Sequence, residues 1–473
     1  MSTMRPPGSD GWPAVGQSLA FARDPFGFYS RMGRYGDVVR THVFGRVVYQ
    51  VRHPEPVRTV LVEDHARYEK SEILQESAEE LAPTGLVTLD GEQWQRVRGL
   101  VQPAFYREQV ERYDDAMRTA TERASAGWTD GERLAVADEM RSLTLDVLSQ
   151  AMFSGDVGGP GTDDPIDRAT RAINDRFDVS SPSRFLPSWV PTPTNRRYRR
   201  AVAAFDDTIE TLVAQRRDRA DPGEDLLGML VAAGDDDGLT DEELRDQLFT
   251  FLFAGHETSS MALTYAWLLL ASNPECRRRL EQEVDALDGA PDARAVRDGL
   301  PYTEAVVREA LRRYPPVFVL FRQPTADTTL HGYHIPEGTD LSIPVIELHR
   351  DGRWWDAPDA FRPERWLVPT EASDFGDDFV PDAAATRDPA TDDLRVLADP
   401  PGRPEYAYCP FGGGPRTCIG NRFAMLELQL ALATLARDWR FDLAPDQSAD
   451  PDLRMSVTLQ PSDPIELVAR RRD

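Results

Sequence analysis

One cysteine, Cys418, lies in a glycine-rich segment, residues 411–420, that reads Phe-Gly-Gly-Gly-Pro-Arg-Thr-Cys-Ile-Gly. Apolar residues recur at helical spacing directly after this segment and predict a helix over residues 421–439. A thiolate at a helix start lies at the positive end of the backbone dipole, which lowers its pKa. The glycines let backbone N–H groups approach the sulfur, and Arg416 adds a fixed cation beside it. These residues suit an ionised sulfur that binds a metal, with an anionic group nearby.

The spacing of Phe411, Gly414, Arg416, Cys418 and Gly420 resembles the haem-binding loop of the cytochromes P450, the haem-thiolate monooxygenases. The resemblance implies haem b as the cofactor and Cys418 as the axial ligand of its iron. In this family the thiolate pushes electron density onto the iron and favours O–O cleavage. A lone cysteine is more often a buried structural residue, but five constrained positions match here. Three further motifs, in the order that the family carries them, add context.

A long apolar helix is predicted over residues 244–272, and it carries Ala-Gly-His-Glu-Thr-Ser at 254–259. Glycine weakens a helix, and Thr258 can divert the carbonyl four residues earlier, so we expect the helix to open there. The segment resembles the acid–alcohol pair of the family, which implies that Glu257 and Thr258 relay protons to O2. The alternative is a core helix with Glu257 in a salt bridge. His256 is expected to be packed or at the surface rather than a ligand.

Glu309 and Arg312 are three residues apart on one face of a predicted helix, which on its own indicates an ordinary surface pair. Tyr-Pro-Pro ends this helix, and Phe-Arg-Pro-Glu-Arg-Trp follows at 361–366. Together they resemble the family's Glu-x-x-Arg and Pro-x-Arg motifs. The resemblance implies a buried network of Glu309, Arg312 and Arg365 that holds the cysteine loop in place. A buried network of charges costs desolvation free energy, so its role is better explained by holding the loop in one geometry than by adding to the stability of the fold.

Haem carries two carboxylates, so its site needs cations or hydrogen-bond donors at fixed places. Trp94 and Arg98 share one helix face at i, i+4 spacing and are similar to the family's Trp-x-x-x-Arg motif. The resemblance implies that both groups reach a propionate, with Arg416 and Arg322 as further propionate partners. His65 is a weaker candidate by position. The alternatives are a core tryptophan and solvated arginines.

Five segments are expected to roof the distal face of the haem: 73–87, 177–189, 249–258, 317–321 and 455–458. They carry apolar side chains, which implies a lipophilic substrate, at Phe185, Trp189, Phe251, Val317, Phe318, Val319 and Leu320. Core packing is the simpler interpretation of each residue alone. No cationic clamp for a carboxylate head is evident, so fatty acids, terpenoids, carotenoids and steroid-like molecules all remain open.

The net charge is −26, and Lys70 is the single lysine among 54 basic residues. An acidic excess almost without lysine favours a protein adapted to a salt-filled cytoplasm, where salt screens carboxylate repulsion. The alternative is an ordinary acidic protein from a GC-rich genome. Either way, the charge argues against nucleic acid as a partner. Three cysteines without a CxxC pair argue against a disulfide scaffold or a zinc module.

The N-terminus is polar and broken by proline and glycine, and no apolar run reaches membrane-spanning length, so we expect a cytoplasmic protein. The pattern predicts a mainly α fold with a minor β portion, the cytochrome P450 fold, as one domain over residues 1–473. Strands are expected as a hairpin over 41–52, as short strands over 332–343 and as a hairpin over 453–468, with helices over most of 91–303. Residues 371–404 are acidic and rich in proline, and we expect a surface insertion there.

The resemblance implies a monooxygenase that inserts one oxygen atom from O2 into a C–H bond. Because the sequence ends soon after the haem loop, we expect a separate ferredoxin or flavodoxin with its reductase as electron donor. The predicted docking face lies near Arg96, Arg107 and Arg422. Two alternatives remain, a peroxide-using or isomerising haem-thiolate enzyme and a non-enzymatic haem protein for gas sensing or storage. Neither needs a proton relay to O2, so Glu257 and Thr258 argue against both.

Overall fold

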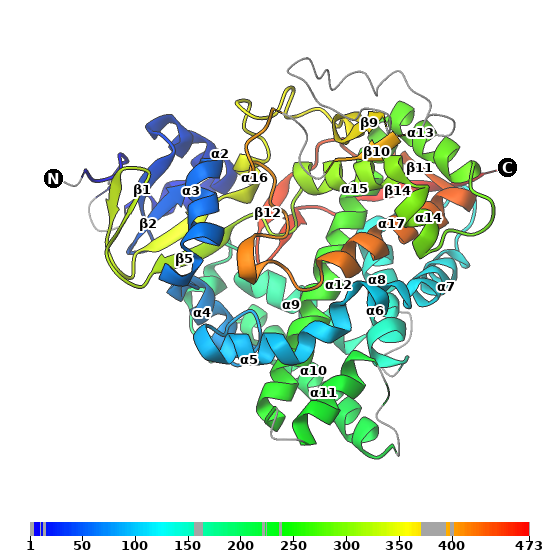
Figure 1. Ribbon diagram of the computed structural model, residues 1–473, viewed down its shortest axis with the longest axis horizontal. Helices are drawn as coiled ribbons and strands as arrows, with labels where there is room; N and C mark the ends of the chain where they lie inside the picture. Colours follow the sequence, from blue (N-terminus) through cyan, green and yellow to red (C-terminus); the bar gives the residue numbers. More distant parts are fainter. Residues whose placement is uncertain are drawn as a thin grey trace.

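The computed structural model describes residues 4–9, 11–12, 16–155, 164–219, 223, 225–235, 239–369, 394–397 and 402–472. Helices make up the larger part of the molecule, and strands β1, β2 and β5 gather at one end beside the N-terminus (Figure 1). The predicted class, mainly α with a minor β portion, is therefore confirmed. None of the described helices combines the length and the apolar character that crossing a bilayer needs.

The α-helices are α1 (Ser18–Arg23), α2 (Pro25–Met32), α3 (Pro54–Arg58), α4 (Glu72–Glu79), α5 (Gly91–Val101), α6 (Arg107–Glu111), α7 (Asp114–Ser125), α8 (Val136–Phe153), α9 (Pro165–Phe177), α10 (Pro193–Arg217), α11 (Leu226–Asp235), α12 (Asp241–Ser272), α13 (Pro274–Asp285), α14 (Ala293–Asp298), α15 (Pro301–Arg313), α16 (Val345–Leu348) and α17 (Asn421–Asp438). The strands are β1 (Val38–Val43), β2 (Arg46–Val51), β3 (Tyr68–Glu69), β4 (Arg133–Ala135), β5 (Leu320–Pro324), β6 (Thr328–Leu330), β7 (Tyr333–Ile335), β8 (Asp340–Ile343), β9 (Leu367–Pro369), β10 (Leu394–Val396), β11 (Trp439–Leu443), β12 (Leu453–Met455), β13 (Leu459–Pro461) and β14 (Glu466–Arg471).

The main sheet has the strand order β1-β2-β8-β5-β3, with β2 and β8 parallel and the other neighbours antiparallel. The predicted hairpin is present, although its first strand begins at Val38 rather than at residue 41. Its two-residue turn places both Phe44 (φ 52°) and Gly45 (φ 80°) in the left-handed region. Such a turn matches the twist of the strands, but an aromatic residue is unusual there. Phe44 remains 39% exposed at the tip of the hairpin.

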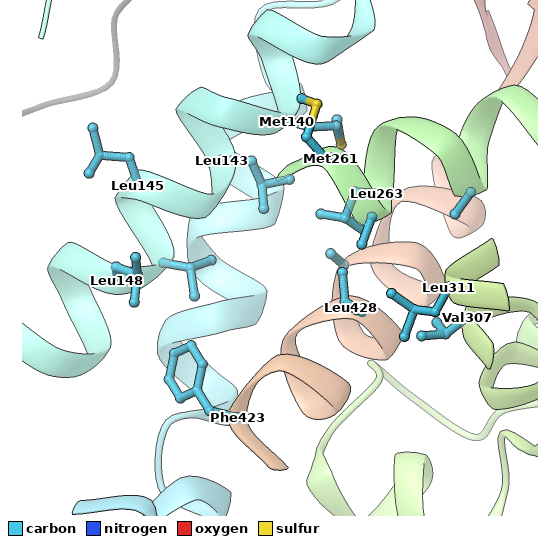
Figure 2. Packing of buried hydrophobic residues seen from close by; sticks show 14 of the residues in the cluster. Met140, Leu143, Leu145, Leu148, Met261, Leu263, Val307, Leu311, Phe423 and Leu428 are labelled. Carbon is cyan, nitrogen blue, oxygen red and sulfur yellow. The ribbon is translucent and has the colours of Figure 1, made fainter. Parts of the chain in front are cut away.

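Helix α12 runs through the centre of the core, and most of its side chains are buried. Its N-terminus has a capping box in which Thr240 and Glu243 each accept a backbone hydrogen bond from the other. Figure 2 shows Met140 and Leu143 of α8 beside Met261 and Leu263 of α12, with Leu428 of α17 close by. Apolar burial on this scale stabilises by roughly 1.5–3 kcal/mol per large side chain, so the central helix is held firmly.

Two sequence predictions need correction in the C-terminal part, and a third falls mostly outside the described residues. The predicted hairpin over 453–468 is wrong in its second half, because β12 pairs with β13 and β14 pairs instead with β11 and β4. The helix after Cys418 ends at Asp438, one residue early, and Trp439 begins β11. The predicted insertion at 371–404 lies largely outside the described residues, but its Leu394–Val396 forms β10, paired with β9.

Candidate active site

The cysteine loop leads directly into α17 and packs closely against the backbone at Leu61. The Cys418 N–H donates to the carbonyl oxygen of Phe411 at 2.9 Å and closes the loop. Gly414 has φ +65°, and a Cβ there would lie 2.0 Å from the Leu61 carbonyl oxygen. Only glycine permits this approach of two backbones. Gly420 is the N-cap of α17, so the predicted placement of the sulfur at a helix start is correct.

The Cys418 side chain is solvent-accessible, whereas those of Cys276 and Cys409 are buried. The groups that lower the pKa of the Cys418 thiol are the N–H of Gly420 and the guanidinium of Arg98, rather than the earlier glycines and Arg416 that the sequence suggested. Although the sulfur is open to solvent, the protein atoms packed around it desolvate the thiolate and raise the pKa of the Cys418 thiol, so the net shift for the free thiol is upward and not the predicted lowering. Burial also raises the pKa of both Cys276 and Cys409 to about 12.

Helix α5 brings Trp94 and Arg98 to the cysteine loop. The Arg98 Nη1 donates to the carbonyl oxygen of Thr417 at 3.1 Å, and its Nε donates to Gln102 at 2.8 Å. The Arg416 guanidinium lies over the Trp94 ring, 5.8 Å from its centroid. The structure therefore brings Trp94, Arg98 and Arg416 together around the loop.

A cluster of three cations lies beside this loop: Lys70 and Arg322 are buried, and Arg416 is half-buried. Arg416 forms an ion pair of 2.5 Å with Asp90, the residue before α5, and Asp90 also accepts the Lys70 N–H at 3.0 Å. Desolvation, with repulsion from Arg416, lowers the pKa of Arg322 to about 10. The predicted cations Arg322 and Arg416 are thus neighbours. His65 lies outside the cluster, since its ring contacts the carbonyl oxygen of Val62 at 2.8 Å.

Lys70 is the cation of this cluster that the sequence reasoning missed. Its Nζ donates to the carbonyl oxygens of Leu86 (2.8 Å) and Leu89 (2.6 Å), and the side chain is buried. Desolvation is the largest cause that lowers the pKa of Lys70 to about 7. The available signal was the retention of one lysine in a chain that otherwise uses arginine.

The charge of the cluster fits a dianionic ligand. Arg322 and Arg416, joined by Lys70 when it is protonated, face the single carboxylate of Asp90, so the cluster has an excess of positive charge. The Arg416 Nη1 is buried without a hydrogen-bond partner among the described residues. Unpaired buried charge is costly, so these groups are suited to two further carboxylates. The propionates of a haem meet this demand.

In the middle of α12, Phe253, Ala254, Gly255 and Thr258 are only half-buried, although the helix around them is buried. The helix is continuous through this segment, so the predicted opening of the helix is wrong. The Thr258 hydroxyl donates to the Ala254 carbonyl oxygen at 2.6 Å, the interaction with residue i−4 that its type suggested. His256 is fully buried, as expected for a packed side chain.

Glu257 is directed toward a different set of partners from Thr258. Its carboxylate accepts from Gln460 (2.6 Å), Asn174 (3.1 Å) and Arg141 (3.4 Å), all of them buried. Adjacent helical residues point about 100° apart, at 3.6 residues per turn, so one face of α12 cannot present both side chains. The structure therefore does not bring Glu257 and Thr258 together as a directly bonded pair. The salt bridge that the sequence left as an alternative is present, with Arg141.

Glu309, Arg312 and Arg365 lie in one buried network. The Glu309 carboxylate accepts from Arg312 at 2.8 and 2.9 Å, from Arg365 at 3.0 Å and from the Trp366 indole at 3.0 Å. The two arginines hold the pKa of Glu309 below its ordinary value in spite of burial. The Arg312 Nη1 donates to the His349 carbonyl oxygen at 2.8 Å. His349 Nε2 in turn accepts the N–H of Cys409, so the network connects to the segment that leads into the cysteine loop.

The predicted roof residues fall into two groups. Val317, Val319 and Leu320 are half-buried, and Phe251 and Phe318 are buried. Phe185 and Trp189, in contrast, are 51% and 71% exposed on the loop between α9 and α10. The Phe185 ring contacts Phe44 of the β1–β2 turn in a tilted arrangement, with ring centroids 4.7 Å apart and an interplanar angle of 49°. The prediction that these two residues line an enclosed roof is therefore wrong.

The three arginines of the predicted docking face differ in their surroundings. Arg96 is paired with Glu243, and Arg107 is paired with Glu111 at 2.8 Å. Arg422 is exposed on the first turn of α17. Because Arg96 and Arg107 are already in ion pairs, Arg422 is the most available of the three for contact with a partner.

Comparison with known proteins is consistent with this geometry. The family model "Cytochrome P450" matches residues 6–469. The chain is 34% identical over 457 residues to cyclooctatin synthase of Streptomyces melanosporofaciens, which covers 95% of this chain and 93% of the relative. It is 33% identical over 445 residues to pentalenene oxygenase of Streptomyces avermitilis, covering 93% and 92% of the two chains. The structure of the retinoic acid-bound cyanobacterial protein CYP120A1 superimposes with a TM-score of 0.81 at 26% identity and covers both chains completely.

The chain belongs to the cytochrome P450 family, and the protein is a cytochrome P450 monooxygenase. The family cofactor is a haem with an axial thiolate, and it supplies iron-based activation of oxygen when bound. The accessible Cys418 sulfur, the cation cluster and the half-buried strip of α12 all fit such a group. In that fit Cys418 would hold the iron, and Arg322, Arg416 and Lys70 would hold the propionates.

Proposed function

We propose that this P450 inserts one oxygen atom from O2 into a lipophilic small molecule, with electrons from a separate ferredoxin or flavodoxin and its reductase. One observation carries the proposal. The central helix α12 is buried along most of its length, yet at Ala254, Gly255 and Thr258 it presents accessible surface. A small residue, a glycine and a hydroxyl at one place leave room for O2 and a water with a hydrogen-bonding partner.

Thr258 is the proposed proton donor nearest the reacting oxygen. Its hydroxyl, which bonds the Ala254 carbonyl in this structure, accepts a proton from water and passes it on. Glu257 is proposed to pass protons to that water from the other side of the helix. There Gln460 and Asn174 hold its carboxylate in place. Glu257→Gln is expected to slow product formation and to divert electrons to peroxide, and its solvent isotope effect should exceed that of the native enzyme.

The proposed substrate is a hydrocarbon-rich molecule without a carboxylate head. Phe253, Val317, Val319 and Leu320 give the half-buried surface near the site an apolar character. The relatives named pentalenene oxygenase and cyclooctat-9-en-7-ol 5-monooxygenase also act, by their names, on a hydrocarbon and an alcohol derived from one. Screening lipophilic extracts for a low-to-high spin shift of the haem would identify candidates.

The test of the proposal has two stages. The reduced protein with CO should show the Soret band of a thiolate-ligated haem, and Cys418→Ala should lose that band. Persistence of the band in Cys418→Ala would refute the ligand assignment. Reaction under ¹⁸O₂ should then place one labelled atom in the product, and label from water instead would refute oxygen insertion from O2.

A peroxide-dependent reaction is the second candidate, because Glu257 bonds Gln460, Asn174 and Arg141 rather than Thr258. Turnover with H2O2 but none with reduced ferredoxin would favour it. For the ferredoxin-dependent reaction, docking is proposed around Arg422, and Arg422→Glu should slow the first electron transfer. The matched control is Arg294→Glu, another exposed arginine, on α14.

A further inference from the structure

Residues 84–89 lie between α4 and α5 and are named here the connecting segment. Two buried side chains of α12 bind the backbone at its start. The Thr84 N–H and the Thr84 hydroxyl both donate to the Asp246 carboxylate, at 2.7 and 2.8 Å. The Gln247 Nε2 donates to the Thr84 carbonyl oxygen at 2.6 Å, and the Gln247 Oε1 accepts the Leu86 N–H at 2.9 Å. One side-chain amide thus pairs with this backbone much as a neighbouring β-strand would.

Glycine at position 85 lets the connecting segment lie directly against α12. A Cβ at Gly85 would lie 2.3 Å from the Thr250 Oγ1, so a larger residue there would push the segment and the helix apart. Thr250 is one helical turn before Ala254 and on the same side of α12. The segment therefore packs at one end of the half-buried strip of α12, where the room for O2 is proposed.

Lys70 holds the connecting segment at a second place. Its Nζ donates to the carbonyl oxygens of Leu86 and Leu89, at 2.8 and 2.6 Å. Leu86 is therefore bound twice, through its N–H by Gln247 and through its carbonyl oxygen by Lys70. A charged ammonium group has three N–H donors, so one donor is left for a carboxylate bound in the cation cluster.

The contacts of Gln247 differ from the usual support of a surface loop. Loop backbone at a protein surface can bond to water, and a buried amide costs desolvation free energy unless its polar atoms are paired. Gln247 is fully buried, and both ends of its amide are paired with the connecting segment. Val87 is 45% exposed, whereas the rest of the segment is buried or half-buried. The anchors thus fix a backbone that presents one accessible apolar side chain.

We propose that the connecting segment is a fixed wall of the substrate site and that Gln247 is the positioning residue that holds it in place. One anchor lies on α12 and the other in the cation cluster, so the wall connects the proposed oxygen site with the residues assigned to the propionates. A backbone bound on both sides does not yield to a larger substrate, so the size limit of the site depends on Gln247. The role in substrate selection rests on the proposed function, whereas the fixed position of the segment does not.

The Lys70 contacts also link the wall to cofactor binding. A carboxylate bound at Lys70 keeps this side chain in the cluster and charged, which strengthens its hydrogen bonds to the carbonyl oxygens of Leu86 and Leu89. Loading with haem is therefore expected to slow amide hydrogen exchange in the connecting segment. Exchange that is the same with and without haem would overturn this link.

Amide hydrogen exchange of the haem-loaded protein, followed by mass spectrometry of peptides that contain residues 84–89, tests the hold on the segment. Gln247→Met keeps the length of the side chain but removes both of its hydrogen bonds. The segment should then exchange on the order of 10-fold faster, the factor expected from the loss of a hydrogen bond. The matched control is Gln429→Met on α17, another buried glutamine, whose Nε2 donates within its own helix to the Met425 carbonyl oxygen at 2.8 Å. Equal exchange of the segment in the two variants would overturn the proposal.

A second pair of variants tests the same hold from the side of the segment. Gly85→Ala should displace the segment from α12 and speed its exchange, because the new Cβ meets the Thr250 Oγ1. Adding Thr250→Ala removes that oxygen and should restore slow exchange. Gly85→Ala without an effect, or a double variant without recovery, would refute close packing on α12 as the cause.

Substrate selection is tested with two azoles, imidazole and the larger 4-phenylimidazole, whose binding to the haem iron shifts the Soret band. A wall that yields leaves more room, so Gln247→Met should favour the larger azole over imidazole by roughly 10-fold more than the native protein does, the lower end of what one methylene of room is worth. An unchanged or reduced preference would overturn the role in selection. The CO spectrum of each variant checks that its haem site is intact. Exchange and azole binding need no turnover, so failure of the ¹⁸O₂ experiment would refute the proposed function alone.

Discussion

Glu309→Gln is the perturbation with the clearest expected magnitude. Five N–H groups converge on the Glu309 carboxylate, two from Arg312 and one each from Arg362, Arg365 and Trp366. Glutamine keeps the shape but offers one acceptor oxygen, and its NH2 group would face donors. The change also leaves the charges of Arg312 and Arg365 buried without a counter-charge.

Removing one partner of a buried ion pair costs about 3–5 kcal/mol, against a total stability of about 5–15 kcal/mol for a typical protein. We therefore expect Glu309→Gln to lose much of its folding stability and to bind little haem, because the network connects through His349 to the segment before Cys418. The assay is urea unfolding followed by circular dichroism and by the Soret band. The matched control is Glu304→Gln on the same helix, whose partner Arg308 is partly exposed and whose loss should cost less than about 1 kcal/mol.

Equal midpoints for Glu309→Gln and Glu304→Gln would refute the reasoning that buried, unpaired arginines dominate the effect. The pH dependence gives a second check. The pKa of Glu309 is lowered from 4.5 in the folded protein, so its contribution to stability is present above that pH. This contribution is lost as pH falls through the folded pKa, and Glu309→Gln should lack that part of the acid dependence.

Four further predictions concern two other buried charges, Lys70 and Glu427, and the acidic surface. Lys70→Met should raise the stability of the haem-free protein at neutral pH, because folding lowers the pKa of Lys70 to about 7 and so disfavours its charged form. The difference in stability between this variant and the native protein should shrink as pH rises toward 10.5, where the unfolded chain also loses the proton. The same variant should release haem roughly 10–100-fold faster to apomyoglobin, since a hydrogen bond to a charged group is worth about 1.5–3 kcal/mol, and an unchanged rate would exclude Lys70 from propionate binding. Glu427→Gln should stabilise the protein increasingly as pH rises from 4.5 to about 8, because burial beside Ser259 raises the pKa of Glu427 to about 8; a gain that is independent of pH would contradict that shift. Because salt screens the mutual repulsion of a net charge of −26, the urea midpoint should rise as salt is raised from about 0.1 M to about 1 M, and a falling midpoint would contradict a destabilising role of that repulsion.

Local signals were sufficient for much of the fold. The apolar run over residues 244–272 predicted α12, and the alternation around Val47 predicted the first hairpin, because each pattern reports burial of side chains. The second half of the C-terminal hairpin failed for a different reason. Strand β14 pairs with β11, the strand that follows α17, and not with the strand nearest to it in the sequence. No short-range pattern encodes such a pairing.

The site was predictable where spacing alone fixes geometry and uncertain where side-chain direction matters. Glu309 and Arg312 meet because three residues nearly complete a helical turn. Glu257 and Thr258 are adjacent, but their hydrogen bonds go to different partners, and only the position of α12 among α8, α9 and the β12–β13 hairpin decides this. Trp189 was predicted to lie in a segment that roofs the haem, yet the direction of the loop exposes its side chain to solvent.

The burial of Lys70 gives the protein a built-in chemical reporter. It is the only ε-amino group in the chain, and both carbonyl contacts of its Nζ lie in the interior. An acylating reagent can modify it only when the segment around Leu86 and Leu89 separates from it. The rate of acylation at Lys70 therefore measures how often the cation cluster opens locally. Mass spectrometry of the one peptide that contains Lys70 is enough to determine this rate.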